Sequence, residues 1–288
     1  MDNRLGKMFK AIFRLVRVGQ WYKNFAVLFP LLFAPEHLLY SWSEYLIAFF
    51  GFCLASSITY IVNDWMDRES DRLHPVKKNR PLASGAISGT QAAVIVFILF
   101  LFVLAACFYL GMFYGLVILT YVVFTNAYSF GLKNVPVLDI FLISLNFVLR
   151  TGAGINSFAP GQIWPYYLLI FSVIVLLLSH KRSSDVKIVG ENAIKHKPVL
   201  RFYSKRNTYI VRVIAYFILL LVLFALFQQG VWFAILLAMA ALLSLTSIAL
   251  SLRPGISMRP KYLFTIWYWD IAFVVLIVVV CVNKFIFL

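Results

Sequence analysis

Residues 46–85 read LIAFFGFCLASSITYIVNDWMDRESDRLHPVKKNRPLASG. The first seventeen positions form an apolar run, and the 23 positions from 63 onward then hold four acidic and five basic residues. An apolar run of this kind is typical of a membrane-spanning helix. The sequence therefore places carboxylates beside cations at one face of a membrane, and this pattern predicts a site for a metal-bound polyphosphate.

The chain as a whole has the composition of an integral membrane protein. Its 288 residues are 62% hydrophobic and only 13% charged, with a mean hydropathy of +0.89. Because backbone polar groups in lipid must be satisfied within each segment, we expect an all-α fold of about nine transmembrane helices around a cytoplasm-facing cavity, in a single membrane domain over 1–288. The expected spans lie near 24–35, 43–63, 90–110, 112–130, 137–157, 163–180, 208–228, 231–251 and 263–284.

The distribution of Lys and Arg predicts the topology. With the N-terminus in the cytoplasm, 24 of the 26 basic residues fall on cytoplasmic segments, and the intervening external loops hold none. The net charge of +15 therefore belongs to cytoplasmic loops and not to a nucleic-acid-binding surface. Two long cytoplasmic loops are expected, at 64–89 and 181–207.

The first 23 residues have an amphipathic pattern. Apolar residues recur at helical spacing, and Lys7, Lys10, Arg14 and Arg17 follow the opposite face. We interpret 1–23 as a basic amphipathic helix in the cytoplasmic interface. A basic tail that only sets the orientation of the first span is the alternative.

Three aspartates follow the second expected span. If its helix continues past Asn63, a rotation of 100° per residue places Asp64, Asp67 and Asp71 within about 60° of one another. Three convergent carboxylates need a cation, and sparse oxygen ligands of this kind favour Mg²⁺. A solvated loop that Arg68 and Arg72 neutralise is the alternative.

A group of cations comes directly after the aspartates. The prolines at 75 and 81 stop the helix, so the loop is expected to fold back toward the carboxylates. A chelated diphosphate needs Lys or Arg on the oxygens that the metal leaves uncovered. The residues that fill this role in the prediction are His74, Lys77 and Arg80.

Charged residues also occur inside the fifth expected span. Asp139, Asn146 and Arg150 are spaced by seven and four residues, so they align on one helix face. Charges in a span face the bundle interior or a wet cavity, and either substrate binding or a structural ion-pair network explains them. Tyr128 and Lys133, at the cytoplasmic end of the fourth span, are expected to reach the same cavity.

Two motifs resemble the UbiA superfamily of intramembrane prenyltransferases. They are N-D-x-x-D-x-x-x-D-R at 63–72 and R-P-L-A-S-G at 80–85. Within that superfamily the chain is most similar to the polyprenyl-phosphate phosphoribosyltransferases, the decaprenyl-phosphate branch. The features that carry this narrower resemblance are H-P-x-K at 74–77, Q-W-x-K-N at 20–24, and Y-x-F-G-L-K at 128–133 followed by Asp139, Arg150 and Gly154.

The second cytoplasmic loop favours this branch. Enzymes that ionise a prenyl diphosphate typically hold it between two Asp-rich motifs, whereas the loop here reads SHKRSSD and holds Lys181, Arg182 and one carboxylate, Asp185. One metal site and one cationic site suit phosphoribosyl pyrophosphate, which carries a diphosphate at one end and a phosphate at the other.

The resemblance implies transfer of 5-phosphoribosyl from phosphoribosyl pyrophosphate to a polyprenyl phosphate, with release of pyrophosphate. It implies that Asp64, Asp67 and Asp71 hold Mg²⁺, and that these three act in catalysis together with Lys77 and Arg80. The substrate-binding residues that it implies are Lys23, Asn24, Asn63, Arg72, His74, Tyr128, Lys133, Asp139, Arg150, Lys181, Arg182 and Asp185. The expected location is the bacterial inner membrane, with the site on the cytoplasmic side.

Two other functions remain open on the sequence. One is an aromatic prenyltransferase of the same fold that uses a polyprenyl diphosphate. The other is a non-catalytic transporter or lipid-binding membrane protein, which would favour polar residues that reach both faces.

Overall fold

The computed structural model describes residues 2–32, 37–154, 164–189, 198–203 and 205–228, and all the regular structure in them is helical. The all-α prediction is therefore confirmed for the described part of the chain. A single membrane domain was expected, and the contacts divide the chain into two compact units. One comprises Met1–Pro30, Tyr40–Phe130 and Leu149–Ser157; the other comprises Leu31–Leu39, Gly131–Val148 and Phe158–Leu288.

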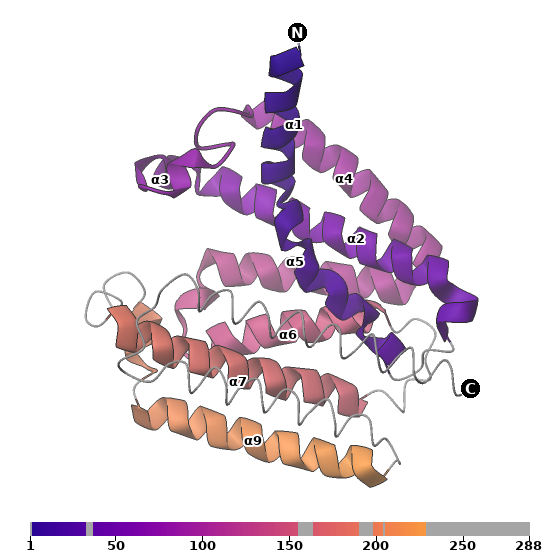
Figure 1. The fold of residues 1–288 in the computed structure, drawn as a ribbon, viewed down its shortest axis with the longest axis vertical. Helices are drawn as coiled ribbons and strands as arrows, with labels where there is room; N and C mark the ends of the chain where they lie inside the picture. Colours follow the sequence, from indigo (N-terminus) through magenta and orange to yellow (C-terminus); the bar gives the residue numbers. More distant parts are fainter. Residues whose placement is uncertain (1, 33–36, 155–163, 190–197, 204, 229–288) are drawn as a thin grey trace. The chain divides into compact units, whose positions relative to one another are not determined.

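The first unit contains the N-terminal helices and the segment quoted above (Figure 1). The pattern that predicts an amphipathic helix at 1–23 gives an α-helix that ends earlier, at Val16, before the chain continues as a 3₁₀ helix. In chain order the elements are α1 (Asp2–Val16), η1 (Val18–Leu32), α2 (His37–Met66), α3 (Arg68–Leu73), η2 (Lys77–Asn79), α4 (Gly89–Leu110) and α5 (Met112–Phe130).

The core of the first unit lies between α2, α4 and α5. Phe52 and Tyr121 are fully buried and their rings are 4.6 Å apart, and Tyr114 donates a hydrogen bond to the carbonyl oxygen of Ala48 at 2.9 Å. Glycine at position 51 makes room for this tyrosine, because a Cβ there would lie 2.5 Å from the Tyr114 hydroxyl. These contacts fix α2 against α5. The charged residues at the end of α2 are therefore held on a fixed helix.

The segment η1 occupies most of the first expected span. It is a 3₁₀ helix of 15 residues, and at about 2.0 Å per residue it extends roughly 30 Å, close to the thickness of the hydrocarbon layer. The Q-W-x-K-N motif anchors it, since Trp21 donates to Ser57 at 3.1 Å and Asn24 donates to Ser56 at 3.2 Å. This motif therefore has a packing role on α2.

The loop between α2 and α4 folds back on a small core of its own. Leu82 and Ile87 are buried against Ile61 of α2 and Leu15 of α1. A capping box at Ser88 then starts α4, because the Ser88 side chain accepts from the backbone N–H of the third helical residue. This apolar core holds the end of α1 and the loop cations at the end of α2.

The second unit is built on a pair of long helices. Its elements are η3 (Leu132–Asn134), most of α6 (Leu138–Ala153), α7 (Trp164–Val189), η5 (Pro198–Arg201) and α9 (Lys205–Gln228). α7 packs along α9 around the buried side chains of Leu176 and Leu219. Because α7 continues to Val189, residues 181–189 are helical where the sequence predicts a loop.

Several helices expose the apolar surface that a membrane covers. Five helices of the described part are long and apolar enough to span a membrane: Trp42–Met66, Gly89–Leu110, Met112–Phe130, Trp164–Arg182 and Arg206–Ala225. In Gly89–Leu110 only 17% of the most apolar window is buried, so most of its side chains face outward. The chain is a multi-pass membrane protein, and the expected spans at 231–251 and 263–284 lie outside the described residues.

Gly154 provides a test of the packing between η1 and the end of α6. A Cβ at this position would lie 1.8 Å from the carbonyl oxygen of Val27, so Gly154→Ala forces a backbone shift. We expect a loss of at least about 1–3 kcal/mol in stability, measured as a lower thermal unfolding midpoint in detergent. Gly115→Ala is the matched control, because its Cβ would meet its nearest neighbour at 3.7 Å. Equal midpoints for the two variants would contradict this packing.

Candidate functional site

One guanidinium group joins two buried aspartates at the end of the second span. Nη1 of Arg80 donates to Oδ1 of Asp64 at 3.0 Å and to Oδ2 of Asp71 at 2.7 Å. The side chains of both aspartates are only 3% exposed. Two buried carboxylates at such close range repel each other strongly, and the shared cation offsets that repulsion.

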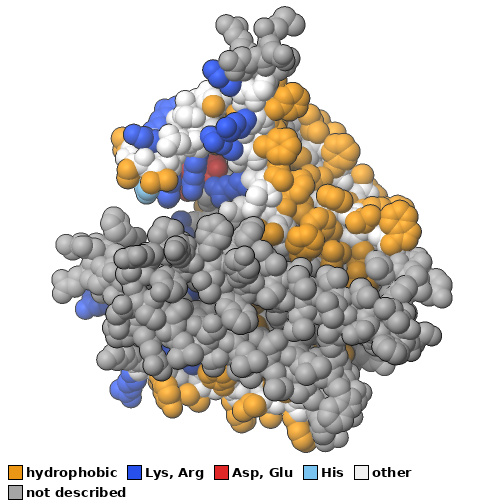
Figure 2. All heavy atoms as spheres, viewed as in Figure 1, with side chains coloured by type: hydrophobic (Ala, Val, Ile, Leu, Met, Phe, Trp, Pro, Cys, Tyr) orange, Lys and Arg blue, Asp and Glu red, His pale blue; other side chains and the backbone are white. Residues whose placement is uncertain are grey.

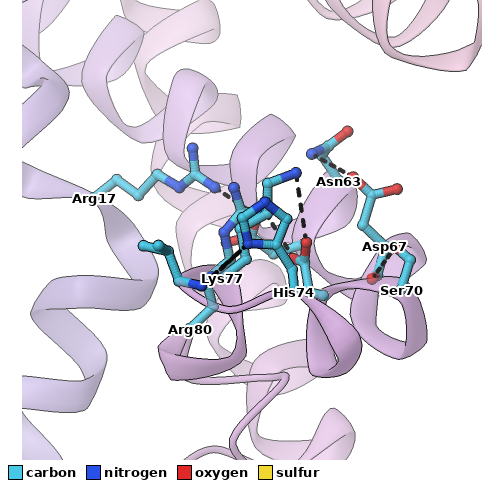
Figure 3. A network of polar contacts seen from close by, with 10 residues as sticks. Arg17, Asn63, Asp67, Ser70, His74, Lys77 and Arg80 are labelled. Carbon is cyan, nitrogen blue, oxygen red and sulfur yellow. Dashed lines mark hydrogen bonds and ion pairs between the residues drawn. The ribbon is translucent and has the colours of Figure 1, made fainter. Parts of the chain in front are cut away.

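Two further cations extend this pair into an alternating chain. Nη2 of Arg17 donates to Oδ1 of Asp64 at 2.5 Å, and Nζ of Lys77 lies 3.8 Å from Oδ1 of Asp71 (Figure 3). The order is therefore Arg17, Asp64, Arg80, Asp71, Lys77, with charges of alternating sign. Arg17 comes from the junction of α1 and η1, so residues 47 positions apart meet here.

Asp67 does not join the other two aspartates. α2 ends at Met66, Asp67 is a turn residue, and α3 starts at Arg68. The Asp67 side chain accepts from Asn63 at 3.3 Å instead. The expected set of three convergent carboxylates is therefore a pair, and no group of three or more metal-ligating side chains forms among the described residues. The prediction requires one continuous helix, and the chain instead forms a turn at Asp67, between α2 and α3.

The exposed carboxylate of this segment behaves as the self-neutralising alternative predicted. Glu69 accepts from Arg68 at 2.9 Å and from Arg72 at 2.9 Å. The hydrogen bond from Arg68, with the charge of Arg72, holds the pKa of Glu69 below its usual value. This alternative therefore explains Glu69 but not the buried pair.

Two of the predicted substrate-binding residues stabilise the loop. Nδ1 of His74 accepts from the backbone N–H of Val76 at 3.1 Å and of Lys77 at 3.2 Å. Nε of Arg72 donates to the carbonyl oxygen of Ala83 at 3.2 Å, and this bond connects α3 to the later part of the loop. These bonds hold Lys77 and Arg80 in place.

A cavity of about 890 Å³ opens beside the alternating chain. Figure 2 shows Lys and Arg side chains gathered around a recessed acidic side chain beside α1. The charged residues that line the cavity are Lys10, Arg14, Arg17, Asp64, Lys77 and Arg80. Five cations therefore face one carboxylate, and the cavity is suited to an anionic ligand.

Asn24 and Arg150 meet in the interior of the first unit. Nε of Arg150 donates to Oδ1 of Asn24 at 2.9 Å, and Nη2 donates to the hydroxyl of Tyr121 at 3.2 Å. The guanidinium also lies over the Tyr121 ring, 5.0 Å from its centroid. These contacts link η1, α5 and α6. The substrate-binding role predicted for Asn24 and Arg150 stays a prediction beside this structural one.

Asp139 and Arg182 pair in the second unit. Nε of Arg182 donates to Oδ2 of Asp139 at 3.0 Å, and the two side chains are 8% and 0% exposed. The Tyr203 hydroxyl donates to Oδ1 of Asp139 and accepts from the backbone N–H of Val137. Burial, together with the bond to Asp139, raises the pKa of Tyr203, so the phenol remains a donor. Of the two explanations for Asp139, the structure favours an ion-pair network.

The remaining predicted site residues are distributed over both units. Tyr128 is half-buried near the end of α5, Lys23 donates to Gln20 at 2.6 Å, and Lys133 is half-buried in η3. Lys181 is exposed on α7, and Asp185 lies on the same helix, where its side chain is outside the described set.

Sequence reasoning missed Arg17 and Tyr203. Arg17 was placed on the basic face of the N-terminal helix but given no role in the site. Its position three residues before the Q-W-x-K-N motif, which anchors η1 on α2, is the one local signal that could have pointed to it. For Tyr203, which lies in a predicted loop, the sequence offers no such signal.

The model of the UbiA prenyltransferase family matches residues 25–269. This protein belongs to the UbiA prenyltransferase family. The resemblance drawn from the motifs at 63–72 and 80–85 is thus confirmed.

Individual relatives agree with this assignment. The chain is 31% identical over 199 residues to the decaprenyl-phosphate phosphoribosyltransferase of Mycolicibacterium smegmatis, a match that covers 67% of this chain and 62% of that protein. The protein of that name from Corynebacterium glutamicum is 33% identical over 201 residues, 66% of this chain and 59% of its own length. The match thus spans about three fifths of these relatives. A UbiA homolog from Archaeoglobus fulgidus, solved with GPP and Mg²⁺, has the same fold at a TM-score of 0.67 and 18% identity, covering 94% of this chain and 99% of that one.

Tyr203 gives a test of the buried network in this UbiA protein. Tyr203→Phe removes the hydrogen bond to the fully buried Asp139 carboxylate, so we expect a loss of about 1–3 kcal/mol in stability. Thermal unfolding in detergent measures the change. Tyr209→Phe, at an exposed tyrosine of α9, is the control and should unfold like the wild type. A Tyr203→Phe variant as stable as this control would refute the network.

Proposed function

We propose that this protein transfers a 5-phosphoribosyl group from phosphoribosyl pyrophosphate to a polyprenyl phosphate. The observation that carries the proposal is the alternating chain of Arg17, Asp64, Arg80, Asp71 and Lys77 beside a cationic cavity. Membership of the UbiA family and the similarity to the mycobacterial and corynebacterial decaprenyl-phosphate phosphoribosyltransferases support the same reaction. The proposed location is the bacterial inner membrane, with the cavity on the cytoplasmic side.

The carboxylate pair has the donor chemistry that Mg²⁺ requires. Mg²⁺ in phosphate-binding sites takes one or two carboxylates and completes its shell with water and phosphate oxygens. Oδ1 of Asp64 accepts hydrogen bonds from the guanidinium groups of Arg17 and Arg80. Its Oδ2 makes no hydrogen bond with any described residue. Asp64 and Asp71 would hold the ion, with Asp67 and Asn63 close by in sequence as further oxygen ligands or contacts to metal-bound water. When bound, the ion neutralises negative charge on the diphosphate.

The cations of the alternating chain are the groups that would receive the diphosphate. A guanidinium or ammonium group that leaves a carboxylate can donate the same N–H bonds to a phosphate oxygen. Lys77 and Arg80, held by the loop bonds of His74 and Arg72, would therefore stabilise charge on the leaving pyrophosphate.

The proposed reaction needs no strong general base. The bond between the anomeric carbon and the pyrophosphate oxygen breaks, and a bond from that carbon to an oxygen of the lipid phosphate forms. The attacking oxygen is already anionic, so the protein contributes position and electrostatic stabilisation of an oxocarbenium-like centre. Further contacts to the sugar phosphate or the lipid phosphate are proposed for Lys23, Lys133, Lys181 and Arg182, and to ribose hydroxyls for Asp185.

A direct assay tests the reaction. Purified protein with labelled phosphoribosyl pyrophosphate, Mg²⁺ and polyprenyl phosphates of several chain lengths should give a phosphoribosylated lipid by mass spectrometry. A parallel reaction with an isoprenyl diphosphate and an aromatic acid tests the aromatic prenyltransferase alternative. Product in this second reaction, with none in the first at any chain length, would overturn the proposal.

Variants of two acidic residues connect turnover to the buried pair. Asp71→Asn removes one charge from the Arg80 and Lys77 contacts, and we expect turnover to fall at least about 100-fold while the protein still folds. Glu69 lies two residues before Asp71 in the same short helix, where it is exposed and outside the cavity. The Glu69→Gln variant should therefore retain at least half of the activity. Thermal unfolding of both variants verifies the fold. Similar turnover in the two variants would show that the Asp64–Asp71 pair takes no part in the reaction.

A further inference from the structure

The cavity has more cations than its aspartates use. Arg17, Lys77 and Arg80 pair with Asp64 or Asp71. Lys10 and Arg14 line the same cavity, yet neither forms a hydrogen bond or ion pair with any residue that the structure describes. Like charges that gather on one wall repel one another, so this excess favours an anion in addition to the diphosphate.

The cationic wall belongs to a helix that is held in place. Lys10, Arg14 and Arg17 are spaced by four and three residues, so they follow one face of α1 and its end. Leu15 is fully buried in the core of Ile61 and Leu82, which fixes the last turn of α1. Just beyond it, Arg17 adopts a left-handed backbone (φ 54°) and reaches Asp64. The backbone at Arg14 is therefore held by the residues that directly follow it.

The chemistry of the wall suits a phosphate group that is attached to an organic substituent. Phe13, which is 60% exposed, lines the cavity next to Arg14, and Val76, which is 72% exposed, lines it from the loop. An arginine beside exposed apolar side chains can bind a phosphate while its neighbours contact the substituent. Free pyrophosphate has no group that would use those apolar contacts.

We infer that Lys10 and Arg14 of α1 form a subsite for a phosphate monoester, distinct from the Asp64–Asp71 pair. The inference rests on the proposed function, in which two phosphate monoesters meet: the 5-phosphate of the sugar donor and the phosphate of the lipid acceptor. The amphipathic helix α1 is then part of the substrate site as well as an interfacial helix. It would share the role that is proposed for Lys181 and Arg182, of which Arg182 is paired with Asp139.

Binding of two small probes tests the subsite without turnover. Full-length protein in phosphatidylcholine nanodiscs, free of Mg²⁺, is titrated by calorimetry with ribose 5-phosphate in one series and geranyl phosphate in the other. Arg14→Gln should weaken the Kd of one probe at least about tenfold. Loss of geranyl phosphate binding assigns the subsite to the lipid acceptor, and loss of ribose 5-phosphate binding assigns it to the donor. Arg14→Lys should recover part of the affinity because it restores the charge.

Lys7→Gln is the matched control. Lys7 is exposed on the same face of α1, one turn before Lys10, and is not part of the cavity wall. The Lys7→Gln variant measures the general attraction of a basic helix for anions. This substitution should change the Kd of either probe by less than about twofold. The inference is overturned if neither probe binds the wild type at millimolar concentration, if Arg14→Gln binds both probes like the wild type, or if Lys7→Gln weakens binding as much.

The two proposals fail in different experiments. Probe binding that depends on Arg14, together with no phosphoribosyl transfer, leaves the subsite in place and removes the proposed reaction. Transfer that proceeds in Arg14→Gln with wild-type KM values for both substrates removes the subsite and leaves the reaction.

Discussion

The guanidinium of Arg80, shared by two buried carboxylates, is the interaction on which the functional end of this protein depends. The side chains of Asp64 and Asp71 are each 3% exposed, and the shared cation offsets the repulsion between them. Arg80 is 16 residues after Asp64 and nine after Asp71, so the loop must fold back from α3 to bring them together. The apolar core around Leu82 holds the loop in this position. The loop side of the cavity follows from that position, because the same loop also supplies Lys77.

The fold was largely predictable because apolar spans are long, uniform signals. The spans expected at 90–110 and 112–130 correspond to α4 and α5 almost residue for residue. Helix ends were less predictable. Lys181 and Arg182 were assigned to a loop because they are charged, yet charged residues can extend a helix beyond the membrane, and α7 continues to Val189. In the same way, nothing local distinguishes the turn at Asp67 from a continuing helix turn.

The candidate site was predictable in composition but not in its pairings. Asp64, Asp71, Lys77 and Arg80 were identified from one segment, and the structure brings these four together. The contact of Arg17 with Asp64 depends on how α1 docks on α2, and periodicity within either helix carries no information about docking. Other long-range contacts cannot be predicted for the same reason. One example is the contact between Asn24 and Arg150, which are 126 residues apart.

Binding of a divalent cation by the Asp64–Asp71 pair is the central claim, and Mn²⁺ binding followed by electron paramagnetic resonance tests it most directly. Inorganic pyrophosphate supplies the phosphate oxygens, so the measurement needs neither sugar nor lipid. We expect about one bound Mn²⁺ per chain in the wild type and an affinity at least about tenfold weaker in Asp64→Asn. Equal binding of Mn²⁺ by the two proteins would contradict it.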